Sequence, residues 1–275
     1  MKLLHSALVA TAIVPVLFVS QVGVAAQAWI TSYNYKKLNN TYLASTIITR
    51  DGSDGLYTIQ ERDNNVKITA PLTNKGGNTR ELFWPANSPD VMDSESCATL
   101  SKQYAAPGIT TGSITQQGAA LRIVQTPAGT RGMTVTKNIW YGATWAFNVH
   151  VWDSGKSPVL TQLAGFDMSE YDPDGQGEAR PEIVLGKMWW DENHNLQSDL
   201  KPFPWHLCAR TVGSTFQFKV WSDDVAKQPA WNDAKYVREV QIPADWNVPG
   251  KVGWFIGHLN PGHSAEFQNL QTQYR

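Results

Sequence analysis

The sequence has almost no excess of charge of either sign, since its 275 residues include 23 Lys and Arg against 24 Asp and Glu. Proteins that bind nucleic acid usually carry a basic face, and polybasic membrane-surface proteins carry clustered cations, so neither class is expected. Charged residues make up only 17% of the chain and hydrophobic residues 42%, which excludes a disordered protein. The chain is instead rich in aromatic residues and chain breakers, with 12 Trp, 21 Gly and 15 Pro. This composition predicts a folded, turn-rich protein.

Acidic residues are missing before Asp51. A short basic start precedes an apolar stretch over residues 7–26, and Ala26-Gln27-Ala28 has the small-x-small pattern of a signal-peptidase site. The sequence therefore predicts a signal peptide over 1–28, a secreted protein, and one jelly-roll domain over 29–275. An uncleaved anchor helix is the alternative, because about 20 apolar residues can span a bilayer, although a proline interrupts this run. No later stretch is long enough to span, so the processed chain is not expected to cross a membrane.

Cysteine is scarce, and both cysteines lie in the part of the chain expected after processing. Cys97 and Cys208 are 208 − 97 = 111 positions apart. Two thiols in an exported chain most simply form one disulfide, and a loop of this length contributes about 4–5 kcal/mol in the chain-entropy description. A catalytic thiol would need a paired base, and a zinc site would need further ligands at metal spacing. The sequence therefore predicts a Cys97–Cys208 disulfide.

Helical periodicity is also missing, because no window of about 11 residues sustains an apolar stripe at helical spacing. Short alternating segments separated by turn residues recur instead, which is typical of a sandwich or barrel. The predicted fold class is all-β, a two-sheet antiparallel jelly-roll sandwich of the concanavalin A-like kind. Strands are expected at 43–49, 56–60, 66–70, 79–84, 119–125, 133–139, 145–152, 182–190, 207–212, 215–221, 237–242, 251–259 and 265–272.

Two C-terminal segment pairs carry a resemblance to known proteins. Phe216-Gln217-Phe218-Lys219-Val220-Trp221 is followed by Gln228-Pro229-Ala230-Trp231, and Val252-Gly253-Trp254-Phe255-Ile256-Gly257-His258 by Ala265-Glu266-Phe267-Gln268-Asn269-Leu270. These resemble the "KVW … PAW" hairpin and the last two strands of the laminin-G and concanavalin A-like jelly rolls of secreted bacterial proteins. The resemblance implies the fold and, because most members act on carbohydrates, a carbohydrate ligand. It leaves the activity open, since the fold carries lectins, glycosidases, lyases and adhesion modules alike.

Two carboxylates form the candidate catalytic pair. Glu182 and Glu266 are spaced like the nucleophile and the acid/base of family-12 endoglucanases, also jelly rolls, although the Met and Trp that follow their nucleophile are missing here. A retaining glycosidase needs two carboxyl groups about 5–5.5 Å apart, and the alternative is two exposed strand glutamates. The paired motifs of jelly-roll alginate lyases are matched only in part, by Arg80-Glu81-Leu82 and Asn148-Val149-His150. Both segments lack key residue types of those motifs, the glutamine in particular.

A polar and aromatic row forms the candidate ligand-binding site. In the strand expected at 145–152, Asn148, His150 and Trp152 share one face because side chains alternate. We expect this row to face solvent on the concave sheet, with Trp152 stacking on a sugar and its neighbours bonding hydroxyls. The alternative is a row in which Trp152 packs on a neighbouring strand. Of the adjacent Trp189 and Trp190, one is expected in the core and the other as a stacking platform.

These observations predict an exported, lectin-like protein that binds extracellular or cell-envelope glycan. The expected partner is a polysaccharide or oligosaccharide, with no nucleic acid and a monomeric chain. An endo-acting glycoside hydrolase or polysaccharide lyase is the first alternative, and a protein-interaction module that uses its Trp surface is the second. No metal or other cofactor is expected. Calcium at Asp172-Pro173-Asp174-Gly175 is the alternative, because this segment resembles part of an oxygen-ligand calcium loop.

Overall fold

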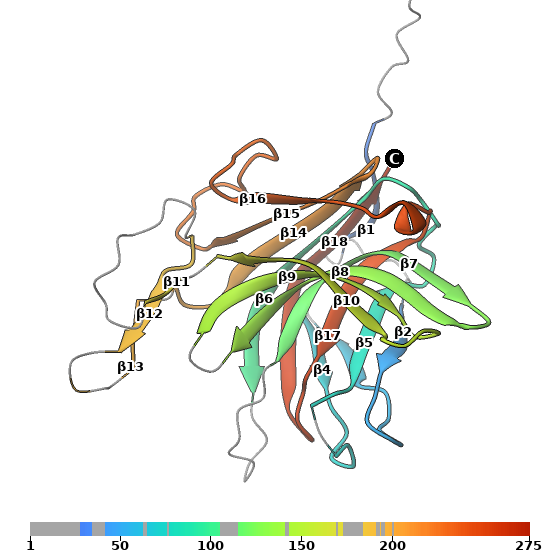
Figure 1. Cartoon of the computed structure of the whole chain (residues 1–275), viewed down its shortest axis with the longest axis horizontal. Helices are drawn as coiled ribbons and strands as arrows, with labels where there is room; N and C mark the ends of the chain where they lie inside the picture. Colours follow the sequence, from blue (N-terminus) through green and yellow to red (C-terminus); the bar gives the residue numbers. More distant parts are fainter. Residues whose placement is uncertain are drawn as a thin grey trace, which may run out of the picture.

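The computed structural model confirms the predicted all-β sandwich. Two antiparallel sheets pack face to face, and a small three-stranded sheet lies to one side (Figure 1). The helical structure in the described part of the chain is one 3-10 turn, Ala244–Trp246. The structure describes residues 28–34, 42–62, 65–75, 77–104, 115–140, 143–168, 170–172, 184–190, 193, 196–199 and 201–275.

The strands are arranged in two large sheets, here called sheet A and sheet B. Sheet A contains, in spatial order, β16 (Val237–Gln241), β15 (Thr215–Ser222), β14 (Trp205–Val212), β6 (Ser94–Tyr104), β18 (Ser264–Tyr274), β4 (Asn65–Thr69) and β3 (Thr58–Arg62), with β1 (Ile30–Asn34) also paired to β18. Sheet B contains β10 (Leu160–Asp167), β9 (Ala143–Asp153), β8 (Gly129–Trp140), β7 (Gln116–Thr126), β17 (Lys251–Gly257), β5 (Arg80–Pro85) and β2 (Leu43–Thr49). The small sheet contains β11 (Glu170–Asp172), β12 (Lys187–Trp190) and β13 (Leu196–Ser198).

The main hydrophobic core fills the space between the two sheets. On β9, Phe147, Val149 and Val151 point into it and are buried, as the alternation of a strand predicts. Phe147 stacks on Phe218 of β15 in the facing sheet, with the ring centroids 6.1 Å apart. The predicted core face of this strand is therefore confirmed.

Sheet B is strongly curled. On its concave face, which is turned away from sheet A, side chains of distant strands therefore meet. Trp152 of β9 and Phe255 of β17 stack with ring centroids 5.6 Å apart, although β8 and β7 lie between their strands. In a flat sheet three strand spacings would separate them by roughly 14 Å. Gly132 on β8 permits this approach, because a Cβ there would lie 3.0 Å from Leu82 Cδ1 of β5. The concave face of sheet B is therefore narrow.

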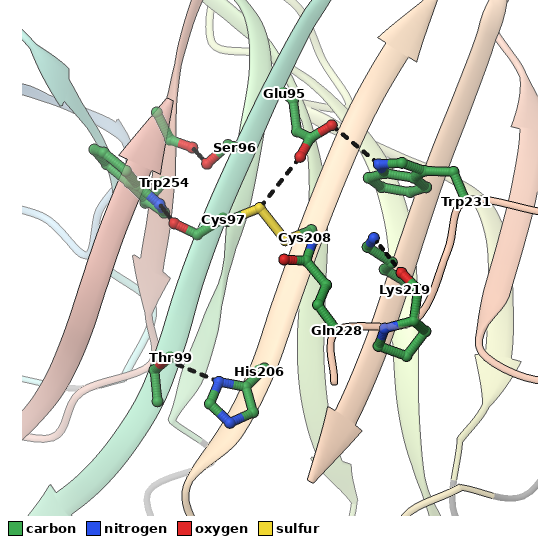
Figure 2. Close-up of a disulfide and its surroundings, with 12 residues drawn as sticks. Glu95, Ser96, Cys97, Thr99, His206, Cys208, Lys219, Gln228, Trp231 and Trp254 are labelled. Atoms are coloured by element: carbon green, nitrogen blue, oxygen red, sulfur yellow. Dashed lines mark hydrogen bonds between the residues drawn. A yellow bond between two sulfur atoms is a disulfide. The ribbon is translucent and has the colours of Figure 1, made fainter. Parts of the chain in front are cut away.

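The disulfide predicted from the sequence is confirmed. Cys97 on β6 and Cys208 on β14 are directly opposite in the antiparallel ladder, with Cα atoms 4.1 Å apart. Figure 2 shows the bridge on the outer face of sheet A, beside Glu95 and Gln228. Gln228 Nε2 lies 3.6 Å from Cys208 Sγ, and Glu95 Oε2 accepts a hydrogen bond from Trp231 Nε1 at 3.0 Å. The bridge therefore joins neighbouring strands from the two halves of the chain.

The strand expected at 182–190 is only partly correct. β12 begins at Lys187, and Leu185, which precedes it, lies in the main core. Both backbone amides of Val184 and Leu185 donate to the carbonyl of Met168, at 3.1 and 2.9 Å. The apolar side chains before Lys187 therefore pack into the core from a connecting segment and not from a hydrogen-bonded strand.

No helix in the described ranges is long and apolar enough to cross a membrane.

Candidate functional site

One half of the concave face of sheet B is a second apolar core. Its members come from five strands whose side chains meet inside the curl: Ile48, Leu82, Trp84, Ala120, Ile123, Trp152 and Phe255. Leu160 and Val159 pack against them from the β9–β10 side. This half is closed by its own side chains and leaves no aromatic face for a ligand.

The expectation that His150 and Trp152 face solvent is wrong. They do lie on the concave face with Asn148, but His150 is 4% exposed and Trp152 only 1%. The Trp152 indole stacks on Phe255, and its Nε1 donates to Thr134 Oγ1 at 2.8 Å. The curl of sheet B explains the burial, because it brings β17 and β5 over β9. In this conformation Trp152 is a core residue, while Asn148 remains partly exposed.

The other half of the concave face is polar, and we call it the polar site. Strand pairing places its residues on one face: Thr136 is opposite Asn148, Gln162 is opposite His150, and Arg80 is opposite Gly257, which is in turn opposite Gln116. The side chains reach across the face as well, because Gln116 Nε2 donates to Asn138 Oδ1. The polar site consists of Arg80, Gln116, Thr136, Asn138, Asn148, His150, Gln162 and His258.

Arg80 is the central group of the polar site. Its Nη1 donates to Thr49 Oγ1 at 3.1 Å and to the Asn78 carbonyl at 3.2 Å, and its Nε donates to Gln116 Oε1 at 3.4 Å. Its Nη2 donates to His258 Nε2. Because a guanidinium can only donate, this contact requires His258 to be neutral with its proton on Nδ1, where the ring also bonds the Gly77 backbone.

Two buried polar atoms of the polar site have no hydrogen-bond partner among the described residues. They are Thr136 Oγ1 and His150 Nδ1. Thr136 is 0% exposed and His150 is 4% exposed, so neither residue is readily reached by bulk water. Buried polar groups are nearly always paired with protein, water or a ligand. These two atoms are therefore exceptions to that rule, and both are enclosed by the surrounding side chains.

Burial keeps both histidines of the polar site neutral. It lowers the pKa of His150 to about 4, against a smaller opposing effect of the hydrogen bond with the Gln162 side chain. It also lowers the pKa of His258 to about 4, and the charge of Arg80 acts in the same direction on both. At neutral pH the site therefore presents two neutral imidazoles around one cation.

We expect the protein to lose stability as the pH falls from about 6.5 to about 4. Over this range the unfolded histidines, with an ordinary pKa of 6.5, bind protons that His150 and His258 in the folded chain do not bind. By linkage, the free energy of unfolding then decreases with decreasing pH, on the order of 1–3 kcal/mol for each histidine. Glu81 opposes this trend, because burial raises its pKa from 4.5 to about 7. Its contribution to the free energy of unfolding is fully present below pH 4.5 and is lost as the pH rises through 7.

Urea unfolding of the wild-type chain and of His258→Gln across this range measures the effect. The variant should show the smaller dependence on pH. An equal dependence in the two proteins would mean that His258 does not change its protonation on unfolding.

Of the two candidate carboxylates, Glu266 lies in the described part of the chain. Glu266 lies on β18 of sheet A, where its neighbours Ala265 and Phe267 point into the core, so it faces away from sheet B. Its Oε2 accepts from Asn65 Nδ2 at 2.8 Å. Glu182 lies outside the described residues, and the pair remains a prediction.

The remaining candidate sites also stay predictions. Trp189 and Trp190 lie on β12, and the structure describes the strand but not these side chains. Of the possible calcium segment, Asp172 ends β11 and residues 173–175 lie outside the described part. Where the structure is described, the three residues with metal-type ligand atoms close together are Glu95, Cys97 and Cys208. Both sulfurs of that group are already used in the disulfide.

Sequence reasoning missed most of the polar site, although Arg80 and His150 stand in segments it had singled out. Gln116, Asn138, Gln162 and His258 lie on different strands or at strand ends, and only the register of sheet B unites them. The available signal was limited to Gln116-Gln117-Gly118 and Gly257-His258, where polar residues stand near a glycine at a strand end.

Comparisons with known proteins assign no family. No family model matches the sequence, and no curated protein matches it. Similar solved structures include the exoplasmic/lumenal domain of VIP36 in its Ca2+/Man3GlcNAc-bound form, with a TM-score of 0.42, 10% identity, and 85% of this chain and 83% of that chain covered. The CBM2 module of the evolved Dit of Lactobacillus casei BL23 phage J-1 has a TM-score of 0.46, 11% identity, and coverage of 90% and 96%. A galectin-like protein of unknown function from Bacillus subtilis has a TM-score of 0.46, 6% identity, and coverage of 89% and 97%. Likeness at this level gives no information on the ligand of this chain.

Proposed function

We propose that the protein binds a carbohydrate in the polar site. The observation that carries this proposal is the concave row of amide, hydroxyl and imidazole groups whose accessible members are Asn148 and Gln162. Sugar hydroxyls both donate and accept hydrogen bonds, and such mixed side chains offer both roles. Asn148 and Gln162 reach the accessible edge of the site, where Asn148 Oδ1 and Gln162 Nε2 both lie close to Gly165.

The proposed setting is outside the cytoplasm. A disulfide between Cys97 and Cys208 suits an oxidising compartment, and the apolar segment over residues 7–26 has the features of a signal peptide. We therefore propose a secreted or extracytoplasmic protein with one binding domain over 29–275, acting as a monomer.

A polysaccharide lyase that uses the same site is the second candidate function. The observation that favours it is His150, a buried neutral imidazole whose Nδ1 has no hydrogen-bond partner and whose pKa the charge of Arg80 lowers. A neutral imidazole of this kind can accept a proton as a general base. A glycosidase would instead depend on Glu182, which lies outside the described residues, and on Glu266, which faces away from the site.

A glycan array with the purified protein tests binding, and an assay for released reducing ends and unsaturated products tests catalysis. We expect Gln162→Ala to weaken the binding of the retained glycan by about 0.5–1.5 kcal/mol, the contribution of one neutral hydrogen bond. Gln162 is exposed, so the fold should be unchanged. The matched control is Gln60→Ala, an exposed glutamine on β3 of sheet A, which should bind like the wild-type protein. Retention of no glycan on the array would contradict the proposal.

A further inference from the structure

Arg80 carries a charge that no acidic group neutralises in the described part of the chain. Its four hydrogen-bond acceptors are the hydroxyl of Thr49, the carbonyl of Asn78, the amide of Gln116 and the imidazole of His258, all of them neutral. Among carboxylates, Asp51 acts on the pKa of Arg80 through space and raises it, without an ion pair between the two. A guanidinium has five N–H donors, so one donor on Nη2 is left for another group.

This cation lies in a partly dehydrated position. Arg80 is half-buried, and desolvation is the main reason why its pKa is lowered. Its guanidinium also lies 5.4 Å from the centre of the Trp152 ring, at the border of the apolar half. Placing a charge in such surroundings is unfavourable unless a counter-charge pairs with it.

The groups around Arg80 supply no counter-charge from the concave face. His150 and His258 are neutral there, and the other members of the polar site are amides and a hydroxyl. The polar site thus has one positive charge and one unused N–H donor, with the amides of Asn148 and Gln162 at its accessible edge. An anion satisfies the charge and the donor, and hydroxyl groups can pair with the amides.

We propose that the ligand of the polar site is an acidic glycan, and that a sugar carboxylate pairs with Arg80 while the sugar hydroxyls bond the amides of Asn148 and Gln162. This inference rests on the proposed function and specifies the substrate class of the same site. The charge-assisted bond between a guanidinium and a carboxylate is roughly twice as strong as a neutral one. The neutral side chains then orient the ring around that anchor.

The first experiment uses the unchanged chain, so that it does not depend on the folding of a variant. Binding of oligogalacturonate, oligomannuronate and oligoglucuronate is measured by calorimetry, each against its carboxyl-reduced counterpart and against heparin oligosaccharides. We expect one uronate to bind at least about tenfold more tightly than its reduced form, the scale of one hydrogen bond to a charged group. Equal binding of the two forms would overturn the inference and leave the proposed function intact. Tighter binding of the sulfated oligosaccharide would overturn the choice of a carboxylate.

The second experiment assigns the effect to Arg80. Arg80→Gln should lose the preference for the uronate over its reduced form, and Arg80→Lys should keep part of it because the charge remains. The control is Arg238→Gln, which makes the same change of charge on β16 of sheet A and should keep the preference. A folded Arg80→Gln with the full preference would overturn the role of Arg80. If no glycan, acidic or neutral, binds the wild-type chain, the proposed function itself fails.

Discussion

Replacing Trp152 by alanine is expected to lower the free energy of unfolding by about 3–5 kcal/mol, the range for a buried aromatic residue. The indole is 1% exposed, stacks on Phe255, and donates to the hydroxyl of Thr134. Its loss would leave a cavity between β9 and β17 and an unpaired hydroxyl. Urea denaturation followed by circular dichroism measures the change.

An exposed apolar residue provides the control for this variant. Leu72 is 78% exposed, so Leu72→Ala should change the free energy of unfolding by less than about 0.5 kcal/mol. A Trp152→Ala protein as stable as the wild type would mean that the concave face is open in solution, as the sequence alone had suggested.

Replacing both Cys97 and Cys208 by alanine is expected to lower the free energy of unfolding by about 4–5 kcal/mol. The bridge closes a loop with a sequence separation of 111, and its loss frees the unfolded chain to explore many more conformations. The native pairing of β6 with β14 should remain, because it runs from Ser94 to Leu100 on β6 with a full ladder. The folded spectrum should therefore be unchanged at low temperature.

A thiol titration accompanies this measurement. The wild-type chain, denatured without reductant, should show no free thiol. Two thiols per chain would show that the bridge does not form, and a double variant with wild-type stability would show that it contributes nothing.

The alternation of β9 predicted which residues share a face but not whether that face is covered. Phe147, Val149 and Val151 were correctly assigned to the core. Burial of Trp152 depends on the curl of sheet B, which depends on strands more than 60 positions away in either direction. No local pattern in one strand contains that information.

Strand β6 was not predicted because its inward positions are small and hydroxylated. Ser94, Ser96 and Ala98 are buried, yet none gives the apolar alternation that marks a strand. Ser96 Oγ donates to the Gly253 carbonyl of β17 at 2.6 Å, so its hydroxyl is satisfied inside the sandwich. A polar residue that is paired across two sheets cannot be distinguished from a surface residue by composition.

The polar site could be predicted only in fragments. Arg80 and His150 were noted in separate short segments, but they are 70 positions apart in the chain (150 − 80). Gln116 and Gln162 carry no motif at all. What unites these residues is the register of six neighbouring strands, from β10 to β5, which arises from the assembled sheet and from no local signal.

The order of the strands has a consequence for how the chain folds. In sheet A, β18 lies between β6 and β4, and in sheet B, β17 lies between β7 and β5. Each sheet is therefore in two separate parts until residues 251–274 are available to join them. Pairings between such distant segments make folding slow, on the scale of milliseconds to seconds. A ribosome-bound chain that lacks these residues would therefore leave both sheets incomplete, so stable folding waits for the end of synthesis.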